Sequence, residues 1–369
     1  MGGAVDVSKD RISIKDVSAL AGVSAATVSN VFSGRKPVNR DLQERVRKAA
    51  SQLGYLPDRA ASQLRSGRTN VVAVLVPDLT DTFFATIVTR FEALAQADGY
   101  DVIVASSRDT PAIEASRLEA LLAFRPAGMI AVPCSNEVPE ALAAEAQRMP
   151  VVLVDRVALP CTVADTVTID NRDAGAVAAR HLVEHGHRDI VLAASRMSMS
   201  PIEERVQSAA DHILRETGRH ATILELGTNV DEGTAIFARW LERHDVPDAV
   251  LASTNVTTLS VLSTFAAFRI AIPDRVSMIA FDDDAWMRAR NTGLTAIRQP
   301  VEEIAEAAWD RLRLRMREGV STPPVSIVMN AGLVVRSSVG QRIPETAALA
   351  LRASPRPAPA SAAADEPLH

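Results

Sequence analysis

Residues 12–34, ISIKDVSALAGVSAATVSNVFSG, contain two short helical patterns separated by a glycine turn. Ser13 and Asp16 have the spacing of a capping box, in which a hydroxyl begins a helix and an acid three residues later binds back. Gly22 suits the left-handed conformation that ends a helix, and Ser24 suits the cap of the next one. Two helices joined by such a tight turn predict a helix-turn-helix motif.

A third helix is expected after Asn39, which can cap it. Its apolar residues recur at spacings of four, three and four, as on one face of a helix: Leu42, Val46, Ala49 and Leu53. The three helices predict an all-α helix-turn-helix headpiece over residues 11–57.

The net charge of −5 hides an asymmetry between the two parts of the chain. Residues 1–70 contain 12 Lys and Arg against 6 Asp and Glu, a net charge of +6, so the remainder carries −11. A basic end on an acidic body indicates that this end meets a polyanion. An unfolded basic arm would have the same composition, but the helical pattern favours a folded headpiece.

The second helix carries no charged side chain around its apolar stripe, which suggests close approach to another surface. Small side chains, hydroxyls and an amide suit a helix that enters the major groove of DNA, with Asn30 placed to pair with adenine and lysines to bind phosphates. The expected DNA contacts are Lys15, Ser24, Ala25, Ala26, Thr27, Ser29, Asn30 and Lys36. The alternative is a helical bundle with an inactive surface, but few such bundles are as basic.

From residue 71 onwards, apolar runs typical of buried strands alternate with helical patterns. The first series is VVAVLVP (71–77), DVIVAS (101–106), GMIAVP (128–133) and PVVLVD (150–155). The second is DIVLAAS (189–195), ATILEL (221–226), AVLAS (249–253) and VSMIAFD (276–282). Such alternation predicts α/β architecture with parallel, doubly wound sheets. Two series predict two lobes over residues 70–340, with a ligand in the cleft at the carboxyl ends of the strands.

Several side chains near predicted strand ends are candidates for binding that ligand. Asp155 and Asp282 each end an apolar run, where a carboxylate can accept hydrogen bonds from sugar hydroxyls. Phe83 and Phe84 follow the first run, and an aromatic face suits the apolar side of a sugar ring. Trp286 follows Asp282 and can stack in the same way. Each also has a structural alternative, as a helix cap or as part of the core.

Four runs of the headpiece form an ordered pattern: ISIKDV (12–17), AGVS (21–24), TVS (27–29) and GYLP (54–57). In this pattern the chain resembles the lactose/galactose repressor family. The body is similar to the two-lobed, periplasmic-binding-protein-like core of the same family. The resemblance covers roughly residues 11–340 and implies a transcription regulator, more often a repressor than an activator. Its operator affinity would be controlled by a sugar or related polyol bound between the lobes.

The resemblance also implies how the parts are used. Residues 58–69 would form a hinge helix in the minor groove, with Leu64 wedged into a base step. Arg205, Thr254 and Gln299 would face the effector. The helix after Pro300 would return to the first lobe, and residues 333–337 would end in the second. A homodimer would bind double-stranded DNA at a pseudo-palindromic operator.

Other classes of function find little support in the sequence. No apolar run is long enough to span a bilayer, no secretory signal pattern begins the chain, and we expect a cytoplasmic protein without membrane contact. Phosphate-binding, hydrolase and metalloprotease motifs are missing from the sequence, so neither an enzyme nor a cofactor is expected. The remaining alternative is a sugar-binding receptor without a working headpiece.

Three histidines and the composition of the last residues carry two further expectations. His181, His185 and His187 raise the possibility of a metal site, but Gly186-His187-Arg188 matches a helix-ending turn of the family, so no metal is expected. Residues 341–369 contain nine Ala and five Pro. Such a composition buries too little apolar surface to offset its ordering entropy, which predicts a disordered tail.

Overall fold

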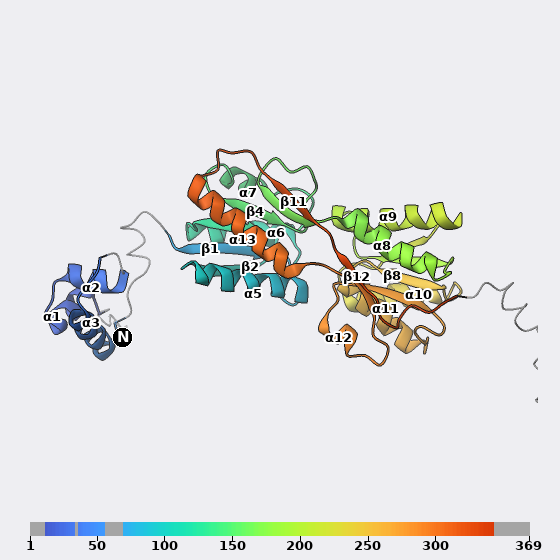
Figure 1. Ribbon diagram of the computed structural model, residues 1–369, viewed down its shortest axis with the longest axis horizontal. Coiled ribbons are helices and arrows are strands. Elements are labelled where there is room, and N and C mark those ends of the chain that lie inside the picture. Colours follow the sequence, from blue (N-terminus) through green and yellow to red (C-terminus); the bar gives the residue numbers. More distant parts are fainter. Residues whose placement is uncertain (1–11, 34–35, 56–68, 343–369) are drawn as a thin grey trace, which may run out of the picture. The chain divides into compact units, whose positions relative to one another are not determined.

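The computed structural model describes residues 12–33, 36–55 and 69–342, and the chain divides into two compact units between Thr69 and Asn70 (Figure 1). The first unit contains three helices: α1 (Ile14–Ala21), α2 (Ala25–Ser33) and α3 (Arg40–Leu53). They enclose a small core of buried side chains: Val17, Ala21, Val28, Val46, Ala49 and Ala50. The second unit contains two α/β lobes.

The ends of the headpiece helices are held by the predicted caps. The backbone N–H of Ser13 donates to the carboxylate of Asp16 at 2.8 Å, which also lowers the pKa of that carboxyl group. The Ser24 hydroxyl accepts the N–H of Thr27 at 3.0 Å. Gly22 has a φ of 61°, the left-handed conformation that glycine adopts without strain. These local signals explain why the helices begin and end where they do.

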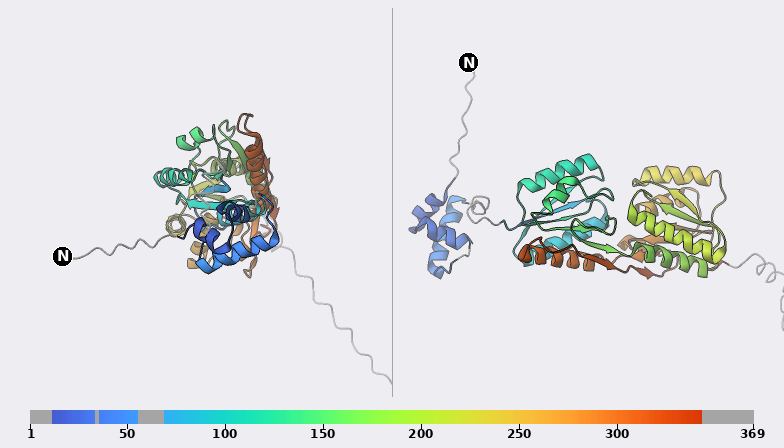
Figure 2. Two further views of the ribbon diagram at one scale, coloured as in Figure 1. Left: turned by 90° about the vertical axis from the view of Figure 1, so that its left-hand side faces the viewer. Right: turned by 90° about the horizontal axis from the view of Figure 1, so that it is seen from above.

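The first lobe is built on a six-stranded sheet in which all neighbouring strands are parallel, in the order β11-β5-β4-β3-β1-β2. Its strands are β1 (Val71–Val76), β2 (Asp101–Ser106), β3 (Gly128–Ala131), β4 (Val151–Val154), β5 (Asp165–Ile169) and β11 (Ser326–Met329). Its helices are α5 (Thr82–Ala97), α6 (Pro111–Ala123), α7 (Glu140–Glu145) and α13 (Val301–Glu318). Helices cover both faces of the sheet (Figure 2).

The second lobe repeats this plan with the order β12-β10-β9-β8-β6-β7, in which β12 is antiparallel to β10. Its strands are β6 (Ile190–Ala194), β7 (Thr222–Glu225), β8 (Ala249–Ala252), β9 (Ser277–Phe281), β10 (Thr295–Arg298) and β12 (Gly332–Val334). Its helices are α8 (Asn171–Glu184), α9 (Ser200–Thr217), α10 (Val230–Leu241), α11 (Asn255–Ala267) and α12 (Ala285–Arg288). In each lobe, the carboxyl ends of the parallel central strands therefore lie at the same edge of the sheet.

The chain passes between the lobes three times, after β5, β10 and β11. The predicted return of the helix after Pro300 is confirmed, because α13 packs against α5 and β4 in the first lobe. β12 ends the path in the second sheet, as expected. The disordered tail was predicted to begin at residue 341. The first two of its residues are instead ordered, and the N–H of Arg342 donates to the carbonyl of His185 in the second lobe. The rest of the tail and residues 58–68 of the hinge lie outside the described residues.

Four strands, β5, β10, β11 and β12, were not predicted as strands. β5 shows the reason, because its sequence alternates threonine with apolar residues rather than forming a continuous apolar run. Thr166 and Thr168 are nevertheless buried within the sheet. Burial of these hydroxyls depends on neighbouring strands that a local pattern does not reveal.

Helices α8 and α9 lie side by side in the second lobe (Figure 1), and a glycine permits their close approach. A Cβ atom placed on Gly175 would lie 2.0 Å from the backbone oxygen of Arg205. Since that neighbour is backbone, the helices themselves would have to separate to admit a side chain.

We therefore expect Gly175→Ala to lower the free energy of unfolding by about 1–3 kcal/mol through overpacking. Urea denaturation of the variant, followed by circular dichroism, measures this loss. Gly332→Ala is the matched control, because nothing lies within 4 Å of the added Cβ there. Equal stability of the two variants would show that the α8–α9 contact adjusts without cost.

Candidate functional site

The outer face of α2 gathers small polar side chains. Ala26, Ser29 and Asn30 follow one another at helical spacing, whereas Val28 points into the core and is fully buried. Ala26 is exposed, and Ser29 and Asn30 are partly buried. Among the described residues, no other group forms a hydrogen bond with the Asn30 side chain. Within the part of the chain that the structure describes, the donors and the acceptor of this amide are therefore unused.

The other predicted DNA contacts differ in how far they are engaged within the protein. Lys15 and Lys36 are exposed. The Ser24 and Thr27 hydroxyls lie 2.9 Å apart, so both take part in capping α2. Ala25 is partly buried beside them. Leu64 lies outside the described residues.

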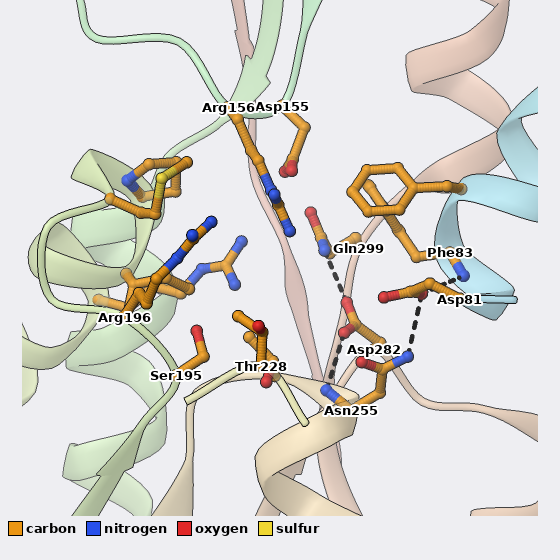
Figure 3. Close-up of a pocket in the computed structure, with 16 residues that line it drawn as sticks. Asp81, Phe83, Asp155, Arg156, Ser195, Arg196, Thr228, Asn255, Asp282 and Gln299 are labelled. Atoms are coloured by element: carbon orange, nitrogen blue, oxygen red, sulfur yellow. Dashed lines mark hydrogen bonds between the residues drawn. The ribbon is translucent and has the colours of Figure 1, made fainter. Parts of the chain in front are cut away.

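In the second unit, a cleft lies between the lobes and encloses about 500 Å³ when its open mouth is counted (Figure 3). It is lined by Asp81, Phe83, Phe84, Asp155, Arg156, Ser195, Arg196, Met199, Pro201, Ile202, Arg205, Thr228, Thr254, Asn255, Asp282 and Gln299. The cleft thus brings together seven of the eight residues predicted for the effector.

Asp155 and Asp282 occupy equivalent positions in the two lobes. Asp155 follows β4 and donates its backbone N–H to the next strand at Val167, and Asp282 follows β9 and donates to Ile297. Both have left-handed backbones, with φ of 62° and 81°. Such conformations are uncommon outside glycine and concentrate at functional sites, and here they turn each carboxylate out of the strand.

The carboxylate of Asp282 accepts two hydrogen bonds. Gln299 Nε2 donates to Oδ1 at 2.6 Å, and the backbone N–H of Asn255 donates to Oδ2 at 3.2 Å. The Asn255 side chain continues the chain of contacts across the cleft, donating to Asp81 of the first lobe at 3.0 Å. Burial raises the pKa of Asp282 to about 7, and the nearby guanidinium of Arg205 opposes this rise.

Arg205 is buried in the wall of the cleft. Its Nε donates to Asn171 at 2.7 Å, and Nη1 donates to the carbonyl of Ser253 at 3.0 Å. The guanidinium carbon lies 4.0 Å from the centre of the Phe281 ring. These contacts fix the side chain at the cleft wall and leave Nη2 without a hydrogen bond to the described residues.

Two further predictions combine binding and structural roles. Phe83 and Phe84 line the cleft but are also buried core residues, with their rings in edge-to-face contact at 5.1 Å. Thr254 lines the cleft and also caps α11, since its hydroxyl accepts the N–H of Thr257 at 3.1 Å. The structural alternative considered for the phenylalanines therefore holds alongside their place at the cleft.

The structure does not place Trp286 among the residues that line the cleft. α12 begins at Ala285 and places the indole against the core of the second lobe. The indole N–H donates to Asp284 at 3.2 Å. Proximity in sequence to Asp282 was not sufficient, because the chain turns away directly after it.

Six polar residues that line the cleft were not predicted from the sequence: Asp81, Arg156, Ser195, Arg196, Thr228 and Asn255. Each follows the carboxyl end of a strand by one to five positions. The rule that selected Asp155 would have found Arg156 and Arg196, had it been applied to cations as well as to carboxylates.

The histidines of the second lobe make local contacts. The rings of His181 and His185 lie 4.2 Å apart, and His187 Nε2 lies 3.0 Å from the carbonyl of Gly340. Within the described ranges, no cluster of three or more metal-ligating side chains is present. Within those ranges, too, no helix has the length and apolarity needed to cross a membrane.

The raised pKa of Asp282 predicts a pH-dependent stability. In the unfolded chain an aspartate ionises near pH 4, so between about pH 4 and 7 the folded state holds a proton that the unfolded state has lost. The contribution of Asp282 to stability therefore falls as pH rises through this window. The variant Asp282→Asn has no carboxyl group at this position, so its stability lacks this dependence on pH.

The free energy of unfolding of the variant minus that of the native protein should therefore increase from pH 5 to pH 8, by about 1 kcal/mol or more.

Urea denaturation at a series of pH values measures this difference. Asp274→Asn, which removes an exposed carboxylate of the same lobe, serves as the control. A difference that stays constant between pH 5 and 8 would contradict the assigned state of Asp282.

Comparison with known proteins agrees with both units. Residues 13–58 match the family of bacterial regulatory proteins of the lacI type, and residues 179–339 match a periplasmic binding protein-like domain. The HTH-type transcriptional regulator PtxS of Pseudomonas plecoglossicida is 32% identical over 333 residues, covering 90% of this chain and 96% of that protein.

Solved structures show the same fold. The Lac repressor dimer bound to operator and the anti-inducer ONPF has a TM-score of 0.77 at 24% identity, covering 90% of this chain and 100% of that one. The transcriptional regulator CelR in complex with cellobiose has a TM-score of 0.65 at 27% identity, covering 89% and 100%. This chain therefore belongs to the lacI family of bacterial regulatory proteins and is a transcriptional regulator that binds DNA through its helix-turn-helix headpiece.

Proposed function

We propose that this regulator is a homodimeric repressor that acts in the cytoplasm. A sugar or related polyol, bound in the cleft, would control its affinity for a pseudo-palindromic operator. The observation that carries the effector assignment is the Gln299 side chain. It is 5% exposed, and its buried Oε1 has no hydrogen-bond partner among the described residues. An unpaired buried acceptor is costly, and a ligand hydroxyl would satisfy it.

The groups around Gln299 suit a molecule with several hydroxyls. Asp155 and Asp282 supply acceptors from the two lobes, and Arg205 supplies a donor. Each hydroxyl of a sugar both donates and accepts, so it can bind both kinds of group at once. CelR, a relative of similar length, is known in complex with the disaccharide cellobiose.

Control of DNA binding requires that the effector prefer one arrangement of the lobes over another. Direct contacts already join the lobes beside the cleft: Thr82 donates to Asp284 at 2.6 Å, and Arg196 donates to Asp109 at 2.7 Å. A ligand that adds or breaks such contacts shifts the balance between arrangements. Coupling of about 1–3 kcal/mol is typical and would suffice to regulate an operator.

In this proposal the cleft binds its ligand and does not transform it, as in the regulators that the chain resembles. On the DNA side, the exposed face of α2 would enter the major groove, with Lys15 and Lys36 on phosphates. A sugar-binding receptor without a working headpiece would lack this activity, so specific DNA binding separates the two.

Asn30→Ala tests the base-reading role. The substitution should weaken binding to the preferred operator by about 1–3 kcal/mol and relax the preference at one base pair of each half-site. Sequencing of random duplexes selected by the native protein and by the variant measures both effects. Gln52→Ala, at an exposed position of α3, is the control. Equal weakening on all sequences would exclude base reading by Asn30.

Gln299→Leu tests the effector site. A sugar and polyol panel is screened for ligands that raise the melting temperature of the native protein, since ligand in excess stabilises by a few kcal/mol. The variant should lose this increase in melting temperature because leucine cannot form a hydrogen bond with a ligand hydroxyl. Gln207→Leu, on α9 outside the cleft lining, should retain it. An unchanged response in Gln299→Leu would place the ligand elsewhere.

A further inference from the structure

Guanidinium groups from both lobes line the cleft. Arg156 follows β4 of the first lobe, and Arg196 follows β6 of the second. Both bind one carboxylate, that of Asp109, through Arg156 Nη1 at 2.5 Å and Arg196 Nη2 at 2.7 Å. Asp109 itself is not among the residues that line the cleft. The three side chains together therefore present a net charge of +1 to the cleft, shared between the lobes.

Not all N–H donors of the arginines in the cleft form hydrogen bonds with the described residues. An arginine side chain has five N–H donors. Arg196 Nε is buried and has no hydrogen-bond partner in the ranges that the structure describes. Arg205, which is 6% exposed, uses Nε and Nη1 within the protein and leaves Nη2 without a hydrogen bond to the described residues. Donors of this kind are best satisfied by an anionic acceptor, because charge-assisted hydrogen bonds are the strongest.

Two of the three carboxylates that line the cleft lie away from Arg196, whereas Asp155 lies beside Arg156. Asp282 and Asp81 are joined through Asn255, and Gln299 lies beside them. Figure 3 shows Arg196 on the opposite side of the cleft from Asp81 and Asp282, with Arg156 reaching between them. The cleft therefore has a side that accepts hydroxyl hydrogens and a side that attracts negative charge.

We propose that the effector is a sugar acid, whose carboxylate binds between Arg156 and Arg196 and whose hydroxyls bind Asp282 and Gln299. This assignment rests on the proposed function, which places a polyol in the same cleft. A carboxylate would give the buried Nε of Arg196 a charge-assisted hydrogen bond, which is stronger than the bond that a neutral hydroxyl oxygen can accept. A carboxylate would also join the two lobes directly, because each guanidinium belongs to a different lobe.

The charge of the site favours a carboxylate over a phosphate. A carboxylate has one negative charge, which matches the net charge of +1 on Arg156, Arg196 and Asp109. Its planar oxygens also fit the fork of a guanidinium in a bidentate manner. A phosphate monoester carries close to two negative charges and would place the excess beside Asp109 and Asp155.

Matched pairs of ligands test this inference by calorimetry on the full chain. Five- and six-carbon aldonic acids are compared with the corresponding alditols, and uronic acids with the corresponding aldoses. Members of a pair differ only in one carboxylate in place of a CH₂OH group. At least one acid should bind ten times or more tightly than its neutral partner. Arg196→Gln should weaken that acid about tenfold and the neutral partner less than threefold.

Two further variants separate charge from structure. Arg196→Lys should keep part of the preference for the acid, because the charge remains while the bidentate fork is lost. Arg243→Gln removes an exposed arginine of the second lobe outside the cleft and should change neither affinity.

The outcomes distinguish this inference from the proposed function. Neutral members that bind as tightly as their acids in every pair would overturn the sugar-acid assignment and leave the polyol effector in place. Glucose 6-phosphate binding more tightly than every acid would also overturn the assignment to a carboxylate. Binding by neither member of any pair would overturn the polyol effector itself, and the sugar-acid assignment with it.

Discussion

The hydrogen bonds of Asn255 join two carboxylates that face each other across the cleft, and the ligand site depends on this bridge. Asn255 is the first residue of α11, so its backbone N–H points out of the helix end and binds Asp282. Its side-chain amide binds Asp81 of the other lobe. Without such a donor, two partly buried carboxylates would repel one another. Their spacing therefore fixes where hydroxyl donors of a ligand can bind.

Much of the fold could be predicted because it follows from local patterns. Continuous apolar runs identified β1 and β6, and capping signals placed the ends of α1 and α2. Strands such as β5 were missed because their buried threonines depend on partners far away in sequence. Local signals describe what a segment can form, and tertiary contacts decide the segments that are ambiguous.

The cleft shows the same division between local and tertiary information. Asp155 and Asp282 could be found because a polar residue at the end of an apolar run is visible in the sequence. The cationic side was missed, since Arg156 and Arg196 acquire a shared role only when two lobes bring them to one carboxylate. The packing of Trp286 could not be predicted from its place in the sequence, because it depends on the short helix α12, which lays the indole against the core of the second lobe.

Several of the contacts between the lobes are hydrogen bonds, which water can replace. Besides the bridge at Asn255, Asn136 binds Ser198 and Ser200 of the second lobe at 2.8 and 2.7 Å. A neutral hydrogen bond contributes only about 0.5–1.5 kcal/mol net, because water replaces it when the lobes part. An arrangement held by such contacts differs from a more open one by a few kcal/mol. A ligand that binds groups of both lobes can supply a free energy of that size, so the polarity of this interface is what allows the cleft to respond to an effector.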